Sequence, residues 1–315
     1  MTSDHVTVVL PTHRRPAALQ RVLRRLADQS DPGVPWDVVV VDNDALPGTV
    51  AASAERALGA IAVPVRVVVE PQLGASNARN RGVAEASGTI VAFIDDDVVP
   101  HEDWLANLVQ PIIAGRWDGT GGQVQLDPSA PRPRWLTPWL LPYFSSFHLS
   151  AVEVDLQTVP YKVLVEPYVL TANAAFTADV LARAGGFDPE LGTRAGVPLG
   201  NEELQLCRRV LAAGGRIGYI PSATVVHDLP PERTRRSFLV RRLYNQGRSD
   251  WVLDRATWST TRTRGVRRAF SLFAYDARFA FGPERKRPPH RWLLTSAVRR
   301  AGFLREALAC LVSRR

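Results

Sequence analysis

The sequence predicts an α/β protein with a mostly parallel, Rossmann-type sheet, helices on both faces of that sheet, and a C-terminal helical extension. Three observations lead to this prediction. Short runs rich in valine and isoleucine alternate with helix-like stretches over the first half of the chain. Several of these runs end in acidic residues, and the charge of the chain changes sign near residue 230.

Strands and helices alternate regularly over the first hundred residues. Near-continuous apolar runs are typical of strands buried on both faces, and βαβ alternation predicts that such strands pair in parallel. The first helix carries an apolar stripe at helical spacing, formed by Leu19, Val22, Leu23 and Leu26. The expected strands are 6–10, 36–41, 65–69 and 89–94, and the expected helices are 16–29, 47–58 and 75–86.

The second half of the chain is less regular. Residues 127–147 alternate prolines with aromatic residues, a composition that disfavours a long helix or a central strand. This segment is either an ordered flap over a pocket or a covering loop that packs its aromatic side chains on the sheet. Beyond it we expect a strand and turn at 168–176, helices at 178–184 and 201–213, short strands at 216–220 and 223–226, and arginine-rich helices from residue 231 onward.

Composition narrows the class of protein. Cys207 and Cys310 lie far apart without metal-ligand spacing, which argues against a disulfide framework and favours a reducing compartment. With no secretory pattern and no apolar stretch long enough to span a bilayer, we expect a cytoplasmic location. Residues 230–315 hold 21 Lys+Arg against 6 Asp+Glu, whereas residues 1–229 hold 18 against 25. An acidic body with a basic tail predicts two different kinds of partner.

The most informative motif is Asp95-Asp96-Asp97, which directly follows the apolar run 89–94. These acids would emerge together at the carboxyl end of a buried strand, where open α/β sheets bind their ligands. Carboxylate oxygens suit Mg²⁺ or Mn²⁺, whose remaining positions are commonly filled by water and substrate phosphates. The alternative reading of the triplet alone is a solvated acidic turn before a helix.

Three weaker signals lie at predicted ligand-binding positions. Asp42 ends the second strand, where its carboxylate can hydrogen-bond a nucleobase or ribose, or simply form a turn with Asn43. The run from Gly74 to Gly82 opens a helix with small residues. It contains Arg79, which can clamp a diphosphate, although an arginine in such a place is commonly just exposed. His227 follows a short strand and is a candidate metal ligand, although a lone histidine there is more commonly structural.

The pair Glu202-Glu203 opens a later helix and supplies a candidate general base. Glu203 aligns with an apolar stripe of that helix, which predicts that it faces inward, whereas Glu202 aligns with a polar face. Partial burial would raise the pKa of Glu203, while the helix dipole acts in the opposite direction. Both acids can instead serve only the helix dipole. The stripe consists of Leu206, Cys207 and Val210.

Taken together, these motifs resemble those of glycosyltransferase family 2, whose members have the GT-A fold. The resemblance covers roughly residues 5–228, and the order and spacing of the motifs are highly specific. In chain order the motifs are Val9-Leu10-Pro11-Thr12-His13-Arg14-Arg15, Val41-Asp42-Asn43, Gly74 to Gly82, Phe93 to Asp97, Thr171 to Phe176, Gly185-Gly186-Phe187-Asp188, Glu202 to Arg209, Ala213 to Ile217, and Tyr219-Ile220-Pro221.

The resemblance implies a nucleotide-diphospho-sugar donor, with uridine or another pyrimidine-type base preferred. Pro11, Thr12 and Asp42 would contact the nucleoside, Arg79 would lie near the diphosphate, and Asp95 would lie near the ribose.

It also implies a divalent cation, Mn²⁺ or Mg²⁺, and a carboxylate base. Asp97 would be the more direct metal ligand, with Asp95 beside it, and His227 would offer a third ligand. Glu203 falls where the family usually has an aspartate base, and Glu202 is the runner-up. Glutamate keeps the carboxylate but lengthens its reach by one methylene. In-line attack by an acceptor hydroxyl through an oxocarbenium-like state would invert the anomeric centre.

The resemblance divides the chain into a glycosyltransferase domain at 1–229 and an arginine-rich extension at 230–315. Within the domain, the donor half would be about 1–125 and the acceptor half about 126–229. Basic amphipathic helices can lie on anionic bilayers and bring an enzyme to a lipid-linked acceptor, peripherally on the inner face of the membrane. The arginines can also merely solvate packed helices or ring the donor entrance. We expect no nucleic-acid partner, because no recognised module accompanies the charge.

The acceptor would be a sugar, a lipid-linked group or a small molecule, and the pathway one of glycan, polysaccharide or glycoconjugate biosynthesis. Two other functions compete. A nucleotidyltransferase that makes nucleotide sugars should carry a Gly-rich loop after the first strand, which residues 11–15 lack. A catalytically silent protein that binds nucleotide sugars or membranes would not need intact Asp95, Asp97 and Glu203.

Overall fold

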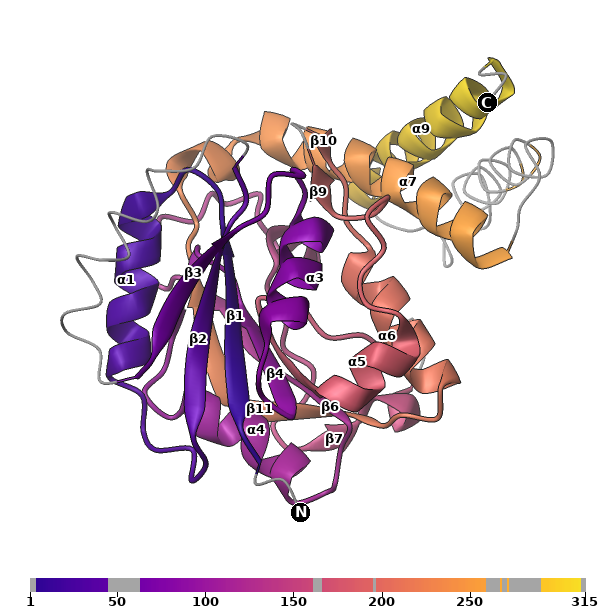
Figure 1. Cartoon of the computed structure of the whole chain (residues 1–315). Helices are drawn as coiled ribbons and strands as arrows, with labels where there is room; N and C mark the ends of the chain where they lie inside the picture. Colours follow the sequence, from indigo (N-terminus) through magenta and orange to yellow (C-terminus); the bar gives the residue numbers. More distant parts are fainter. Residues whose placement is uncertain are drawn as a thin grey trace. The chain divides into compact units, whose positions relative to one another are not determined.

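The computed structural model describes residues 4–44, 63–160, 166–194, 197–258 and 290–312, with the single positions 267 and 271 (Figure 1). The helix expected at 47–58 lies outside the described residues, as does most of the extension between 259 and 289. The chain divides into two compact units. One comprises Met1–Pro189 with Glu202–Pro230, and the other comprises Glu190–Asn201 with Pro231–Arg315.

A nine-stranded sheet, in the order β3-β2-β1-β4-β8-β6-β11-β5 with β7 paired to β11, forms the centre of the first unit. Strands β3, β2, β1 and β4 pair in parallel, and so do β6 and β11. Because β8 lies antiparallel between β4 and β6, these two groups point the same way. The predicted mostly parallel α/β sheet is confirmed. Its strands are β1 (Val6–Thr12), β2 (Trp36–Asp42), β3 (Val65–Val69), β4 (Ile90–Ile94), β5 (Val98–Pro100), β6 (Gly119–Leu126), β7 (Val154–Asp155), β8 (Asn173–Thr177) and β11 (Ile217–His227).

Helices cover the sheet and position its edge. The stripe predicted for α1 (Pro16–Ala27) is confirmed, since all four of its residues are buried. Helix α3 (Ala75–Glu85) packs on β1 and β2 (Figure 1), and it approaches closely because Gly82 has no Cβ to meet the side chain of Val9. Helix α4 (Trp104–Ile113) packs on β6, β8 and β11, and its Trp104 Nε1 donates to Asn173 Oδ1 at 2.8 Å. The other helices of this unit are α5 (Ala178–Ala184) and α6 (Glu202–Ala212).

The structure differs from the expectation in several elements, among them β11, β6 and α4. The strands expected at 216–220 and 223–226 are one strand, β11, with an irregularity between Ile220 and Thr224. Strand β6 was not expected, because its Gly119-Thr120-Gly121-Gly122 start has low strand propensity. These glycines leave room for neighbours, since a Cβ on Gly122 would lie 1.8 Å from the Ala223 carbonyl oxygen. Helix α4 was not expected either, and it holds Pro111 in its interior.

Residues 127–147 form an ordered segment without strands. It contains the 3₁₀ helix η1 (Pro138–Phe144), whose Leu140 and Phe144 are buried while Trp139 remains 40% exposed. Phe147 pairs with β6 at Val124, and its ring packs edge-to-face against Tyr219 with ring centroids 5.7 Å apart. Phe147 therefore covers the sheet, whereas Trp139 does not, so the flap and the covering loop both stay predictions for this segment.

The second unit is built on two long helices, α7 (Arg236–Trp258) and α9 (His290–Val312). Gly247 lies against the backbone of Arg299, and Gly302 lies against the backbone of Tyr244, so the helices pack antiparallel at very close range. Trp251 packs edge-to-face against Phe303 with ring centroids 5.4 Å apart. Among the helices that the structure describes, none is long and apolar enough to cross a membrane. This unit also holds the short hairpin β9 (Thr193–Arg194) and β10 (Val197–Pro198) and the 3₁₀ turn η3 at Pro231–Thr234, whereas η2 (Leu156–Thr158) belongs to the first unit.

Candidate active site

The predicted donor-site residues meet at one edge of the sheet. Thr12 at the end of β1 pairs in register with Asp42 at the end of β2. The acidic triplet follows β4, the other neighbour of β1. Thr12 ties these strand ends together, because its hydroxyl donates to Asp96 Oδ2 at 2.8 Å. Pro11, half-buried, precedes Thr12 in the same strand.

The three carboxylates of the triplet have different partners. Asp95 accepts from Arg79 Nη2 at 2.9 Å. Asp96 is buried and accepts from Thr12 and from Arg15 Nη1, the latter at 3.0 Å. Burial raises the pKa of Asp96 to about 6, against the opposing effects of Arg15 and Thr12. Asp97 accepts from the same Arg15 nitrogen at 3.3 Å. Arg15, on the loop before α1, thus balances two of the three charges.

Asp97 and His227 form the pair best suited to a divalent cation. His227 Nδ1 lies 2.8 Å from the carbonyl oxygen of Asp228, which can only accept, so this contact favours the tautomer with the proton on Nδ1. His227 Nε2 then presents a lone pair towards Asp97 Oδ1, 3.5 Å away. Two lone-pair atoms facing one another fit Mn²⁺ or Mg²⁺. Across the described residues, no group of three or more His, Cys, Asp or Glu can hold a metal, so a cation bound here would need water or substrate oxygens as well.

Asp42 carries a buried hydrogen-bond acceptor to which no described residue donates. Its side chain is 2% exposed, and Oδ1 has no hydrogen-bond partner among the described residues. Burial raises the pKa of Asp42, Asp44 adds to this effect, and His13 opposes it. A buried acceptor without a donor is uncommon, and an N–H or O–H group of a ligand would complete it.

Arg79 is more deeply buried than we expect of an arginine that contacts a bound diphosphate. It is 4% exposed, with Nη2 on Asp95 and Nη1 on Glu202 Oε1 at 3.2 Å, and its guanidinium lies 5.8 Å from the centre of the Phe187 ring. Burial disfavours its charge, but the surrounding carboxylates of Asp95, Glu202 and Glu203 outweigh this and raise the pKa of Arg79. The guanidinium is therefore engaged with protein groups.

The two acids at the start of α6 are buried in the opposite order from that expected. Glu202 is 6% exposed, whereas Glu203 is half-buried. The polar face of α6 faces protein partners, since Glu202 meets Arg79 and Gln205 donates to Asp188 at 3.0 Å. The expectation that Glu203 is the more inward of the pair was wrong. Helical spacing distinguishes the polar from the apolar face of α6, but it does not show that the buried guanidinium of Arg79 stabilises the polar face in the protein interior.

Glu203 has the properties of a base despite its partial exposure. Burial raises its pKa to about 8, the charge of Glu202 raises it further, and Arg79 opposes both. Its carboxylate accepts a long hydrogen bond from Thr171 Oγ1 at 3.4 Å, and a hydrogen bond from its own backbone N–H lowers the pKa slightly. A carboxylate with this pKa can accept a proton near neutral pH.

Comparison with known proteins identifies the family. The family model for glycosyl transferase family 2 matches residues 7–161. Glycosyltransferase AglE of Haloferax volcanii is 25% identical over 311 residues, which cover 96% of this chain and 87% of that protein. The succinoglycan biosynthesis protein ExoM of Rhizobium meliloti is 26% identical over 280 residues, covering 88% of this chain and 82% of that protein. The protein belongs to glycosyltransferase family 2.

Solved structures agree with the GT-A fold expected for this glycosyltransferase. Mannosyltransferase PcManGT from Pyrobaculum calidifontis, in complex with GDP-Man and Mn²⁺, aligns with a TM-score of 0.59 at 18% identity and covers 100% of this chain and 89% of that one. S. aureus TarS 1–349 in complex with UDP aligns with a TM-score of 0.53 at 17% identity, covering 99% and 93%. The predicted fold is confirmed.

Two residues of the glycosyltransferase site were not singled out in the sequence. Arg15 is one, and its ion pairs with the triplet join segments 81 residues apart. Asn43 is the other. Its amide donates to the Glu70 and Gln72 carbonyls at 2.9 and 2.8 Å and accepts from Gly74 N at 2.8 Å, which fixes the loop before α3. Its place in the Val41-Asp42-Asn43 motif was the available signal.

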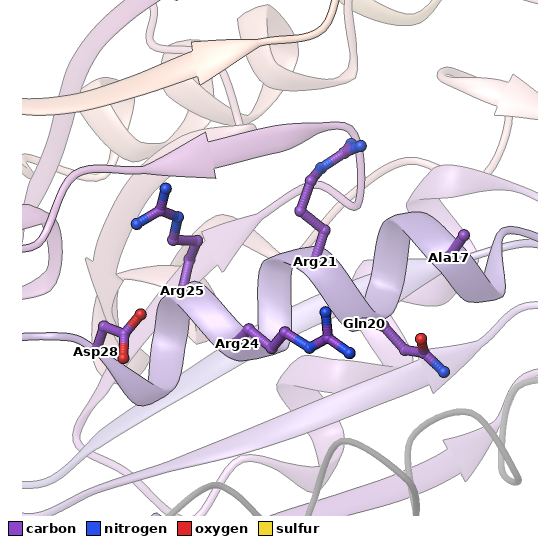
Figure 2. A pocket seen from close by; sticks show the side chains of 6 residues that line it. All are labelled: Ala17, Gln20, Arg21, Arg24, Arg25 and Asp28. Carbon is purple, nitrogen blue, oxygen red and sulfur yellow. The ribbon is translucent and has the colours of Figure 1, made fainter.

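A hollow also lies along the exposed side of α1, away from these residues. Arg21, Arg24 and Arg25 project there beside Asp28 (Figure 2). Arg21 forms an ion pair with Asp228. None of the predicted site residues lines this hollow, so it contributes nothing to the assignment of the active site.

Proposed function

We propose that this family 2 glycosyltransferase moves a sugar from a nucleotide-diphosphate donor to an acceptor hydroxyl, with a divalent cation and Glu203 as base. The observation that carries the proposal is the facing pair of Asp97 and His227, 3.5 Å apart, at the sheet edge where Asp42 also presents a buried acceptor without a partner. One edge thus offers separate groups for a cation and for a nucleoside.

The donor would be held at the ends of β1, β2 and β4. Asp42 Oδ1 would accept from the base or ribose, with Pro11 and Thr12 beside it and Asp95 near the ribose. The solved relatives support a nucleotide donor, since TarS is bound to UDP or UDP-GlcNAc and PcManGT to GDP-Man. Arg79 was predicted to contact the diphosphate, but its burial between two carboxylates gives this role no support.

Asp97 and His227 would hold Mn²⁺ or Mg²⁺, with Asp95 nearby, and Mn²⁺ accompanies the donor in PcManGT. When bound, the cation would stabilise the charge that develops on the departing diphosphate, as a Lewis acid. Arg15 already contacts Asp97, so its guanidinium lies where it can also meet phosphate oxygens.

Glu203 would remove the proton of the acceptor hydroxyl. Its raised pKa suits a group that must bind a proton near neutral pH, and its partial exposure leaves room for an acceptor. Attack opposite the leaving diphosphate would invert the anomeric centre. Glu202 is the weaker candidate, because one of its oxygens is already engaged with Arg79 and the side chain is buried.

The biological setting would be glycan, polysaccharide or glycoconjugate biosynthesis, as the succinoglycan biosynthesis relative suggests. The acceptor would be a sugar, a lipid-linked group or a small molecule. Residues 1–229 would carry transfer, with the donor bound by about 1–125 and the acceptor by about 126–229. Residues 230–315 would serve attachment to an anionic membrane surface from the cytoplasmic side.

Exposed side chains of the second unit favour this attachment. On α9, Leu294 and Leu308 are 69% and 44% exposed, and on α7 Val240 is 52% exposed beside the exposed Arg241. Apolar side chains next to arginines complement a bilayer that carries anionic headgroups.

A thermal-shift screen of nucleotide sugars, each with and without Mn²⁺, followed by a transfer assay with the best donor, tests the proposal. We expect a donor that stabilises the protein only with Mn²⁺ and that loses its sugar to an acceptor. Release of pyrophosphate from a nucleotide triphosphate and sugar phosphate would instead indicate a nucleotidyltransferase, and binding without turnover would indicate a silent binding protein.

A further inference from the structure

Arg79 joins two parts of the active site that are far apart in the sequence. It lies on α3, and its two terminal nitrogens reach Asp95, directly after β4, and Glu202, the first residue of α6. The second of these contacts spans 123 residues of sequence. The donor side and the base helix are therefore connected through one guanidinium.

This connection is buried and tightly constrained. The side chains of Arg79 and Glu202 are 5% and 8% exposed. Glu202 Oε2 and Arg79 Nε have no hydrogen-bond partner among the described residues. Arg79 shares its charge between Asp95 and Glu202, whereas Arg79 is the ion-pair partner recorded for Glu202 among those residues. Removing one member of a buried ion pair leaves an uncompensated charge, which is far more costly than losing an exposed pair.

We propose that Arg79 and Glu202 are positioning residues that hold α6 against the acidic end of β4 and tune the base Glu203, with neither side chain touching donor or acceptor. The inference rests on the proposed role of Glu203. It reassigns the two residues that the sequence had linked to the diphosphate and to a second possible base.

The charges around Glu203 give the two residues opposite effects. Glu202 and Cys207 face it from its own helix, Arg79 faces it from α3, and Asp95 faces it from the end of β4. Burial raises the pKa of Cys207 to about 12, so this group is a neutral thiol. Burial is also the main cause of the raised pKa of Glu203, while Glu202 raises it further and Arg79 lowers it.

The test is the pH dependence of transfer at saturating donor, measured for Glu202→Gln and Arg79→Met. Glu202→Gln removes a negative neighbour while its amide oxygen can still accept from Arg79, so the acid limb should move down by about one pH unit. Arg79→Met removes the positive neighbour, so the limb should move up by a similar amount. Arg79→Lys restores the charge and should return the limb towards its original position.

A partly exposed ion pair on α3, the helix that carries Arg79, supplies the matched control. Arg81 and Glu85 form an ion pair on α3 with side chains 40% and 35% exposed. Arg81→Met and Glu85→Gln change the same charges without touching the buried connection, and both should leave the pH profile where it is. If Arg79→Met fails to fold, the shift in Glu202→Gln decides the matter by itself.

Three outcomes overturn the inference: an unmoved acid limb in Glu202→Gln, shifts of the same sign in both variants, or a folded Glu202→Gln protein that binds donor but no longer transfers. The last would make Glu202 itself the catalytic residue. Glu203→Gln separates this inference from the function on which it rests. Full transfer in that variant removes the base assignment, whereas loss of transfer there with no shift in Glu202→Gln removes only the role given to Arg79 and Glu202.

Discussion

Replacing Asp97 with asparagine keeps the shape of the side chain and removes the negative charge that faces His227. In the wild-type protein Asp97 Oδ1 lies 3.5 Å from His227 Nε2, and Asp97 Oδ2 accepts from Arg15. With the charge gone, His227 is the only strong ligand left in this pair. We expect Asp97→Asn to lose the metal dependence of donor binding.

The magnitude follows from the number of ligands. Losing one charge-assisted contact costs about 1.5–3 kcal/mol. Where two protein groups share the cation, we therefore expect donor affinity in the presence of Mn²⁺ to fall by about 100-fold, or about 2.8 kcal/mol. Affinity without metal should change much less, because the substitution then weakens only the contact between Asp97 and Arg15, which keeps its ion pair with Asp96.

Calorimetric titration of the donor with and without Mn²⁺ measures this ratio directly. Asp127→Asn is the matched control, since Asp127 follows β6 at the same edge but only caps a turn, accepting from Ser129 N and Oγ at 2.8 and 2.7 Å. The control should keep the full Mn²⁺ effect. An Asp97→Asn protein that also keeps it would refute the assignment of the cation to the Asp97–His227 pair.

Three further predictions concern the base, the nucleoside and the membrane. Glu203→Gln should bind donor normally but transfer sugar at least about 100-fold more slowly. In the wild type, transfer should fall as the pH drops through about 8, because the raised pKa of Glu203 leaves the base protonated below that value; a flat profile from pH 6 to 9 in stopped assays would contradict this. Asp42→Asn should weaken nucleotide binding about tenfold in titration. The carboxylate would accept a hydrogen bond from the nucleoside, whereas the amide can place its own N–H groups against that donor; unchanged affinity would exclude Asp42 from the nucleoside site. The double substitution Leu294→Asp and Leu308→Asp should abolish co-sedimentation with vesicles that contain anionic lipid, whereas Val152→Asp, a 65% exposed control in the first unit, should not; wild-type protein that ignores such vesicles would end the membrane proposal.

The strands that carry the proposed donor site were predictable because their signals are local. The strands expected at 6–10, 36–41 and 65–69 correspond to β1, β2 and β3, and the placement of Asp42 and the triplet at strand ends follows from them. Sheet order brings these ends together, and the parallel βαβ rule supplies that order. Strand β6 was not predicted from the sequence. Its glycines are needed for close packing against residues that are distant in the sequence, such as Val169 beside Gly121.

The pairing of charges was not predictable, because it depends on distances that the sequence does not state. Arg79 was expected either near the diphosphate or simply exposed, and Arg15 was not singled out. In the fold each balances carboxylates that lie at least 16 residues away along the chain. A carboxylate cluster concentrated at one sheet edge creates a strong negative potential, and nearby guanidinium groups relieve it even without a ligand. The motif located the cluster, and only the fold revealed its partners.

The start of α6 shows why burial cannot be deduced from polarity alone. The apolar stripe that pointed to Glu203 is real, since Leu206, Cys207 and Val210 are all fully buried. Glu202 is nevertheless the deeper acid, because the interior on its side of the helix offers the guanidinium of Arg79 and so makes a buried charge tolerable. The same arrangement leaves Glu203 without an ion pair of its own in the described part of the chain and with a raised pKa, which is the condition a general base requires. Arg79 on α3 thus pairs with the buried Glu202, while the half-buried Glu203 has no such ion pair among the described residues. Because this one arginine treats the two glutamates differently, they should respond differently to substitution.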